Sequence, residues 1–297
     1  MNLKDLEYLV AIDEERHFNK AASRCFVSQP TLSGQLKKLE AELGILLVER
    51  SNKQVRMTEV GNAIVNQARH ILAETKVLKE ISQAYQDPMT GELHVGLIPT
   101  IAPYLLPLIM PALKENCPKL KLWLHEYQTN VLLDKLRNSE IDLLILALPI
   151  ESDEFAEIDL FKEAFWLATP RDDLLAKHKE VDLMELNSRE MLLLEEGHCL
   201  RGQALDVCFS AGATAHAGFQ ATSLETLRHM VAEGMGTTLI PELAVPTSRN
   251  KSDTIRYIPF KAPQPTRRIG VLYRKGSYRE SVYQTISTII QRQMGVS

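Results

Sequence analysis

Apolar residues recur every three or four positions over residues 3–13, which is typical of one face of a helix. A second helical stretch contains the small pair Ala21 and Ala22, and a third begins near Ser28. The Ser28 hydroxyl can cap a free backbone N–H, and Pro30 fits the first turn, where its missing N–H costs nothing. The pattern therefore predicts a helix-turn-helix in which small residues allow the helices to cross closely.

A longer periodicity runs from residue 58 to about residue 86, where Gly61 is the only Gly or Pro. Apolar residues recur every seven positions at Ile64, Ile71, Leu78 and Tyr85, and the stripe is widened by Val60, Ala68 and Ile81. A long helix with such a seam usually pairs with a copy of itself. We predict a linker helix that dimerises; packing against its own chain is the alternative.

Strand and helix patterns alternate after the turn signal at 87–91. Strands are expected at 92–98, 120–127, 141–148 and 267–275, and helices at 101–116, 129–138 and 281–294, with a helix–Gly–strand unit at 223–243. Repeated units of this kind imply a mainly parallel sheet with helices on its faces. We expect two α/β lobes, with a ligand between them at strand ends and helix N-termini.

The composition is that of a globular protein, with 45% hydrophobic and 24% charged residues and a formal net charge of -4. A chain of 297 residues buries roughly three quarters of its unfolded surface, so it needs no disulfide or metal to hold a core. No run of 18 apolar residues occurs, and the N-terminus carries acids at Asp5, Glu7 and Asp13. Membrane spans and secretion are disfavoured, and a cytoplasmic location is expected.

Charge is distributed unevenly along the chain. Residues 16–58 contain eight basic and three acidic residues, whereas the chain from residue 91 onward contains 22 basic and 26 acidic residues. This asymmetry suggests a small anion-binding module joined to a larger acidic domain.

The run AASRCFVSQPTLSGQLKKLEAELGILLVER at 21–50 resembles the winged helix-turn-helix of the LysR-type transcriptional regulators. Val48 departs from the Phe usual in that family, which affects packing in the module core. Short or amide side chains that can reach base edges or phosphates follow the expected turn, and basic side chains suit phosphate contacts. The candidate DNA-binding residues are Ser28, Gln29, Pro30, Thr31, Ser33, Gln35, Lys37, Arg50, Lys53 and Arg56. The alternative is an ordinary solvated helix face.

The same resemblance implies an α/β fold with an all-α start. It consists of a winged helix-turn-helix at 1–58, a linker dimerisation helix at 59–90, and a two-lobed effector domain at 91–297 like the periplasmic binding proteins. Lobe I spans about 91–161 and 268–297, and lobe II about 162–267.

The most informative stretch of the effector region contains Cys199 and Cys208, whose spacing matches neither a C-x-x-C pair nor a complete zinc set. Cys199 follows His198, precedes Arg201 and lies near an expected helix start, all of which favour the thiolate, the form that reacts with peroxide. In a helix, the nine-residue step to Cys208 separates the two positions by about 13 Å along the axis and places them on opposite faces.

A disulfide requires Cα atoms within about 7 Å, so forming one must dismantle such a helix, as a redox switch requires. Gly202 would lower the cost of that rearrangement. The alternative to a redox switch is that Cys199 and Cys208 are two buried structural thiols. Cys25 and Cys117 are expected to be packing thiols.

The sequence GHCLR at 197–201, the spacing to Cys208 and the run at 221–246 resemble the peroxide-sensing members of the LysR-type regulators. The resemblance implies that Cys199 is the peroxidatic thiol, which passes through a sulfenic acid, and that Cys208 resolves it as a disulfide. It also implies a peroxide pocket formed by Thr100, Thr129, His198 and Arg267. Gly202 stands where an acid is common, and Asp206 stands where a small residue is common.

These observations predict a DNA-binding transcription regulator that senses hydrogen peroxide and activates antioxidant genes, with no cofactor, no metal and no enzymatic activity. The expected partners are double-stranded promoter DNA, hydrogen peroxide, RNA polymerase, a reductant such as glutaredoxin or thioredoxin, and copies of the chain in a homodimer or homotetramer, with no membrane. One alternative is a metabolite-responsive regulator of the same family that binds a small anion between the lobes. Another is a thiol peroxidase, which would leave the N-terminal module unexplained.

Overall fold

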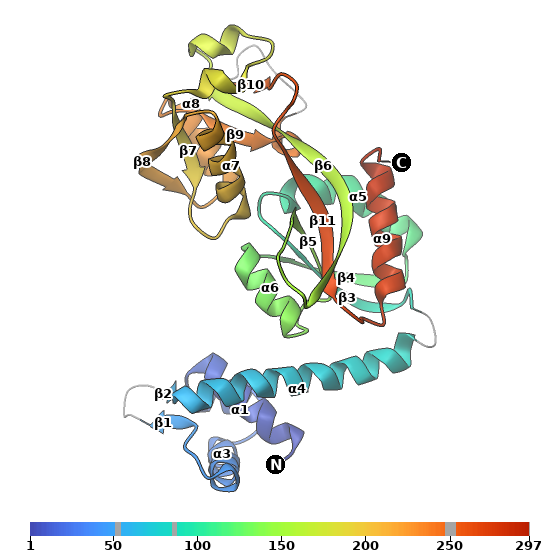
Figure 1. Cartoon of the computed structure of the whole chain (residues 1–297). Coiled ribbons are helices and arrows are strands. Elements are labelled where there is room, and N and C mark those ends of the chain that lie inside the picture. The colour runs from blue at the N-terminus through green and yellow to red at the C-terminus, as the bar shows by residue number, and fades with distance from the viewer. Residues whose placement is uncertain (51–54, 85–87, 247–253, 297) are drawn as a thin grey trace. The chain divides into compact units, whose positions relative to one another are not determined.

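The computed structural model describes residues 1–50, 55–84, 88–246 and 254–296 of the chain (Figure 1). The chain divides into two compact units, residues 1–86 and 87–297, which are described separately. Within the described ranges, no helix has the length and apolar character needed to cross a membrane.

The N-terminal unit is a three-helix cluster followed by a hairpin and a long helix. Its elements are α1 (Leu3–Glu15), α2 (Phe18–Arg24), α3 (Gln29–Leu43), β1 (Val48–Arg50), β2 (Val55–Met57) and α4 (Glu59–Ala84). The Ser28 hydroxyl accepts a hydrogen bond from the Thr31 N–H at 3.3 Å, and Pro30 lies in the first turn of α3, as the sequence predicts. Gly44 ends α3 with a φ of 71°, a conformation that favours glycine.

The small residues predicted to allow close helix crossing are buried in the core of this unit. Ala21 and Ala22 are at most 2% exposed and pack with leucines of α1 and α3. Val48 lies in the same core, and β1 pairs antiparallel with β2. The winged helix-turn-helix predicted from the sequence is therefore formed.

The apolar seam of α4 is divided between two environments. Ala68 is 1% exposed, and Ile64 packs against the core of its own unit. Arg69 of α4 also donates to Asp13 of α1 at 2.8 Å. Leu78, further along the helix, is 69% exposed, and Tyr85 lies outside the described residues. The first half of α4 thus packs on its own chain, whereas Leu78 leaves apolar surface free.

Within its described residues, the larger unit contains one seven-stranded sheet and a separate parallel pair of strands. The seven strands are β3 (Gly91–Leu97), β4 (Leu120–Glu126), β5 (Leu143–Leu148), β6 (Phe155–Pro170), β9 (Thr238–Pro241), β10 (Ile255–Pro259) and β11 (Thr266–Arg274). Their order is β10-β6-β11-β5-β3-β4, with β9 paired to β6. The separate pair is β7 (Glu190–Leu194) and β8 (Thr214–Ala221).

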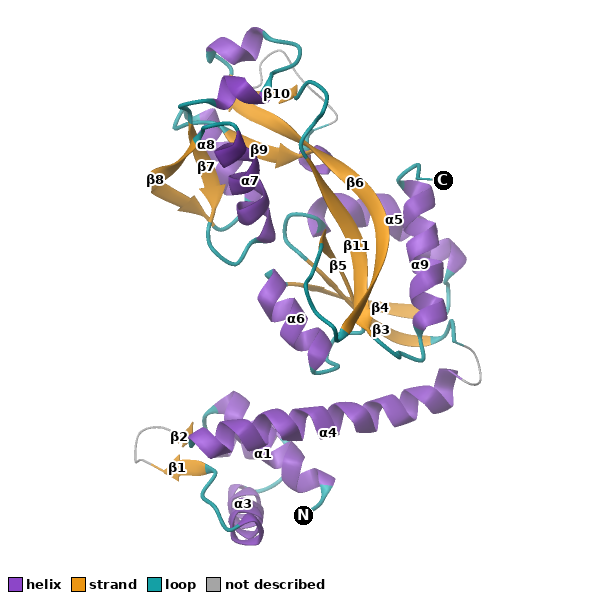
Figure 2. Ribbon diagram, in the orientation of Figure 1, coloured by secondary structure: helices purple, strands orange, loops and turns teal. Residues whose placement is uncertain are grey.

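Helices flank these strands (Figure 2). They are α5 (Ala102–Asn116), α6 (Thr129–Arg137), α7 (Cys199–Ser210), α8 (Leu224–Ala232) and α9 (Glu280–Gln293), with short turns η1 (Leu174–Lys177), η2 (Leu183–Leu186) and η3 (Glu242–Ala244). α5 packs against α9, α6 packs against β5 and β11, and α8 packs against β6 and β7.

The expectation of a mainly parallel sheet is wrong. β3 pairs parallel with β4 and β5, but β6 pairs antiparallel with β9, β10 and β11, and β11 pairs antiparallel with β5. No strand was expected over the 16-residue β6, in which Glu157, Asp159 and Lys162 interrupt the apolar pattern on its exposed side. The register shifts between Ile269 and Gly270, where a Cβ on Gly270 would lie 2.7 Å from the Ile158 carbonyl oxygen.

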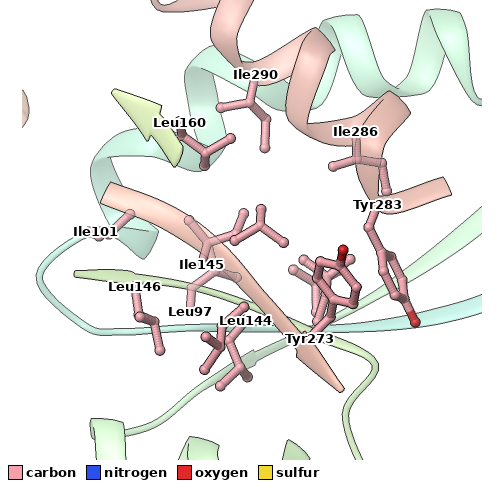
Figure 3. Packing of buried hydrophobic residues seen from close by; sticks show 14 of the residues in the cluster. Leu97, Ile101, Leu144, Ile145, Leu146, Leu160, Tyr273, Tyr283, Ile286 and Ile290 are labelled. Atoms are coloured by element: carbon pink, nitrogen blue, oxygen red, sulfur yellow. The ribbon is translucent and has the colours of Figure 1, made fainter. Parts of the chain in front are cut away.

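β6 and β11 run side by side from one lobe of this unit to the other (Figure 1). Two separate cores lie along them. The first-lobe core contains side chains from β3, β5, α5 and α9, including Leu97, Ile145, Ile286 and Tyr283 (Figure 3). The second-lobe core contains side chains from β7, α7, α8 and β9. The two strands therefore connect two cores that each pack independently.

Candidate functional site

Cys199 is the first residue of α7 and lies where the two lobes meet. Its thiol is free and partly buried, and it packs against the first-lobe core. The next residues of the same helix, Leu200 and Ala204, are 2% and 4% exposed and belong to the second-lobe core. A chemical change at Cys199 therefore acts at the boundary between the two cores.

Cys208 belongs to the same continuous helix, although its side chain lies outside what the structure describes. Nine helical residues span about 13 Å, roughly twice the Cα separation that a disulfide allows. A Cys199–Cys208 bond thus requires α7 to unwind. Gly202 lies between the two cysteines, and a Cβ there would meet no atom within 4 Å. Packing does not require glycine at this position, so its effect is to weaken the helix.

Thr100 and Thr129 lie at the same edge of the sheet. β3 and β4 are adjacent parallel strands with Leu97 opposite Glu126, and each threonine follows its strand by three residues. Gln128, just before α6, donates to Glu195 at 3.1 Å, and its amide lies where a Cβ on Gly197 would be. These contacts bring the loop before Cys199 to the N-terminus of α6.

Arg267 holds Thr100 through a buried network. Its side chain is fully buried, and Nε lies 2.8 Å from the Glu163 carboxylate. Nη1 donates to the Thr100 hydroxyl at 3.0 Å, and Nη2 donates to the Thr100 carbonyl at 3.1 Å. Because the Thr100 oxygen accepts from Arg267, its own O–H is oriented away and can donate to a bound molecule.

His198 and Thr129 supply the remaining polar groups. His198 is 7% exposed, and burial lowers the pKa of its imidazole, with Glu195 at 4.0 Å and the Thr222 backbone opposing that shift. The ring is therefore neutral at pH 7, with one donor and one acceptor nitrogen. The Thr129 hydroxyl is buried and has no partner among the described residues. An unsatisfied hydroxyl of this kind suits a small polar ligand.

The sequence placed Arg201 beside Cys199, but its Nη1 donates to the Leu194 carbonyl at 2.7 Å. The guanidinium thus ties α7 to the end of β7. Glu163, which organises Arg267, was missed altogether. Its partner is 104 residues away, and no local pattern marks that pairing.

The candidate DNA-binding side chains lie along α3 and β2. Ser28, Pro30, Thr31, Lys37 and Arg56 are exposed, while Gln29, Ser33 and Gln35 are partly exposed. Lys53 and the side chain of Arg50 lie outside the described parts of the chain.

Arginines of this unit form ion pairs within it, as Arg69 does with Asp13. Arg16 lies 2.7 Å from Asp13, and Arg24 pairs with Glu14 and Glu15. Acids of the same unit thus partly neutralise these arginines.

Cys25 and Cys117 each pack in a hydrophobic core. Cys25 packs against the N-terminal core, and Cys117 is 5% exposed in the first-lobe core. Burial raises the pKa of both thiols, which disfavours the reactive thiolate.

Two family models match the chain. Residues 3–62 match the bacterial regulatory helix-turn-helix protein of the lysR family, and residues 86–295 match the LysR substrate binding domain. The chain is 50% identical over 294 residues to the DNA-binding transcriptional dual regulator OxyR of Escherichia coli K12, covering 99% of this chain and 96% of that protein.

Solved structures are also similar to this chain. A full-length OxyR mutant from Pseudomonas aeruginosa has a TM-score of 0.78 at 39% identity and covers 98% of this chain and 95% of that chain. A hydrogen-peroxide-bound OxyR mutant from Corynebacterium glutamicum has a TM-score of 0.68 at 34% identity and covers 99% and 92%.

Stability should fall in mild acid because of His198. The unfolded chain binds a proton at this residue below about pH 6.5, whereas the folded chain, with its lowered pKa, resists protonation. We expect the free energy of unfolding to decline as pH falls from about 6.5 through the lowered folded pKa, and His198→Gln to flatten the decline. Urea unfolding at several pH values measures this.

His125 also has a pKa lowered by burial and by the neighbouring charges of His94 and Lys135. His125→Gln should therefore remove another part of the decline of the free energy of unfolding with falling pH. A His198→Gln protein with the unaltered acid dependence would contradict the assignment.

DNA affinity should fall steeply with salt, because each neutralised phosphate releases counterion. Lys37→Ala should weaken binding similarly for all DNA sequences and reduce the slope of log K against log salt by about 1. Fluorescence anisotropy at several salt concentrations tests this, with Lys177→Ala in the other unit as the control. An unchanged slope would remove Lys37 from the interface.

Proposed function

The chain belongs to the LysR family of bacterial transcription regulators, and on this premise we propose that it activates transcription in response to hydrogen peroxide through a reversible Cys199–Cys208 disulfide. The observation that carries the proposal is the position of both cysteines on α7, with Cys199 at the boundary of the two lobes. The hydrogen-peroxide-inducible activators to which the chain is similar over nearly its full length support it.

The chemistry is a two-electron oxidation in two steps. The Cys199 thiolate attacks one peroxide oxygen, the O–O bond breaks, and the departing hydroxide takes a proton to become water, leaving a sulfenic acid. The Cys208 thiolate then attacks the Cys199 sulfur, the S–S bond forms, and hydroxide leaves and is protonated to a second water. Two thiols become one disulfide, and hydrogen peroxide is reduced to two waters.

In this proposal, Thr100, Thr129 and His198 position the peroxide. Thr100 can donate its hydroxyl proton because Arg267 occupies its acceptor side. Thr129 brings an unpartnered hydroxyl, and neutral His198 can both donate and accept. Together they can hold two peroxide oxygens, with the distal one placed as the leaving group.

Disulfide formation changes the second lobe because α7 cannot stay helical. Leu200 and Ala204 leave their places in the second-lobe core when the helix unwinds. The segment thus has two states that a covalent bond selects. Repacking of the effector unit would alter DNA contacts and RNA polymerase recruitment.

The proposal assigns a role to each part of the chain. Residues 1–58 bind promoter DNA, 59–90 link and dimerise, and 91–297 form the effector region, with lobe I at about 91–161 and 268–297 and lobe II at 162–267. Exposed Leu78 on α4 supports pairing of two copies, and DNA half-sites favour such a dimer. We also propose that the protein forms a homotetramer and lies in the cytoplasm. Glutaredoxin or thioredoxin then reduces the disulfide, because reducing compartments keep thiols free between signals.

Cys199→Ser should abolish the peroxide response. With no nucleophile, the protein should form no intramolecular disulfide with stoichiometric peroxide and should keep its reduced DNA footprint. Peptide mapping and footprinting measure both. Cys25→Ser and Cys117→Ser, at thiols in separate cores, are the matched controls and should respond normally. A Cys199–Cys208 disulfide that leaves the footprint unchanged would refute the switch.

Gly202→Ala should oppose the switch without touching either thiol. Alanine stabilises a helix over glycine by about 0.5–1 kcal/mol, and no neighbour obstructs the added methyl group. Stabilising the reduced helix should raise the reduction potential of the disulfide by roughly 10–20 mV. A glutathione redox titration measures the shift. Gly34→Ala in α3, where the methyl group is also unobstructed, is the control and should leave the potential unchanged.

A further inference from the structure

A polar contact joins the two lobes directly before Cys199. Gln128 is the last residue before α6, whose Leu136 lies in the first-lobe core. Its side-chain Nε2 donates to the Glu195 carboxylate at 3.1 Å. Glu195 follows β7, whose Leu194 lies in the second-lobe core. The hydrogen bond therefore crosses from one lobe to the other, four residues before the candidate peroxidatic thiol.

The backbone of Glu195 is fixed in the second lobe. Its N–H donates to the Ala221 carbonyl of β8 at 2.9 Å, and Arg201 Nη1 donates to the Leu194 carbonyl, one residue earlier, at 2.7 Å. A hydrogen bond to a carboxylate is stronger than one between neutral groups. Gln128 thus binds a strong acceptor whose position the second lobe determines.

Gly197 allows the loop after Glu195 to come close to Gln128. Its φ is 95°, in the region that favours glycine, and a Cβ there would lie 2.5 Å from Gln128 Oε1. A side chain at this position would push the amide away from Glu195. The loop from Glu195 to His198 therefore has a conformation that accommodates Gln128.

Gln128 is also next to the candidate peroxide site. It precedes Thr129, whose buried hydroxyl has no partner among the described residues. The loop that it contacts carries His198 and leads into Cys199, the first residue of α7. One amide side chain thus connects the threonine side of this site to the thiol side.

We propose that Gln128 is a positioning residue for the reaction with peroxide. In the reduced protein its amide holds the loop from Glu195 to His198 against the first lobe, which keeps Cys199 at the peroxide site. The bond is released when α7 unwinds to form the disulfide. This inference rests on the proposed function, because it assigns a contact of one redox state to that switch.

Loss of such a contact has two opposite consequences. Because the contact stabilises only the reduced state, its loss makes the disulfide more favourable. Because the contact also orients the thiol, its loss slows the step in which Cys199 attacks peroxide.

Gln128→Glu tests both consequences, because it places a second carboxylate against Glu195. In the full-length protein at neutral pH, the equilibrium constant of disulfide formation against glutathione should rise about fivefold. The rate constant of Cys199 oxidation by hydrogen peroxide should fall about threefold. Redox titration and stopped-flow kinetics measure the two quantities. An unchanged value of either would overturn the proposal.

Exchanging the two partners should rescue the variant. In Gln128→Glu/Glu195→Gln the amide lies on the loop and the carboxylate lies before α6, so the hydrogen bond re-forms in the opposite direction. Both quantities should return to within about twofold of the unaltered protein. Gln284→Glu, the same charge change at an exposed position of α9, is the matched control and should alter neither. No restoration in the exchanged pair would overturn the proposal, because the effect of the single variant would then come from damage to the fold.

Hydrogen exchange tests the contact without any oxidation. In the reduced full-length protein, the peptide that covers residues 195–200 should exchange about fivefold faster in Gln128→Glu and at the normal rate in the exchanged pair. Equal exchange in all three proteins would overturn the proposal. If the unaltered protein forms no Cys199–Cys208 disulfide with peroxide, the proposed function fails, whereas the exchange result still decides whether Gln128 holds the loop.

Discussion

The buried ion pair between Glu163 and Arg267 is the contact on which the effector unit depends. It joins β6 to β11, the two long strands that connect the lobes, and both side chains are at most 2% exposed. Such a pair is stable only when the remaining polar atoms are also bonded, and here Thr100 and the Leu243 N–H complete it. Removing one partner would leave an uncompensated buried charge, so the pair fixes the position of Thr100 and of the η3 turn together.

Helix α7 carries a feature that lowers its intrinsic helical stability. It contributes Leu200 and Ala204 to the second-lobe core, yet it carries a glycine that no neighbour requires. Its first residue packs against the other lobe. The buried ion pair holds the two long strands together, whereas α7 has only modest intrinsic stability. This difference suits a switch, because a single covalent bond can then change the helix and leave the sheet intact.

The sequence was most informative where structure depends on neighbours along the chain. The helix-turn-helix was predicted from the Ser28 cap, from Pro30 in the first turn and from the small pair Ala21–Ala22. The helix considered for the segment after Cys199 is also present, since α7 runs from Cys199 past Cys208. Strands β3, β4, β5 and β11 were anticipated from short apolar runs. Strand β6 was not anticipated, because its charged residues pair with arginines of β11. Asp159 binds Arg268, and Glu163 binds Arg267.

The sequence by itself determined the helix-turn-helix, the strands β3, β4, β5 and β11, and the nine-residue spacing that makes a disulfide incompatible with an intact helix. It also located the positive charge in the N-terminal module. Only the tertiary structure decided that the sheet is mixed, that Arg267 is held by a glutamate 104 residues away, and that Arg201 turns to a β7 carbonyl. The physical reason is that local propensity acts over a few residues, whereas strand pairing and buried charge are set by groups that only folding brings into contact.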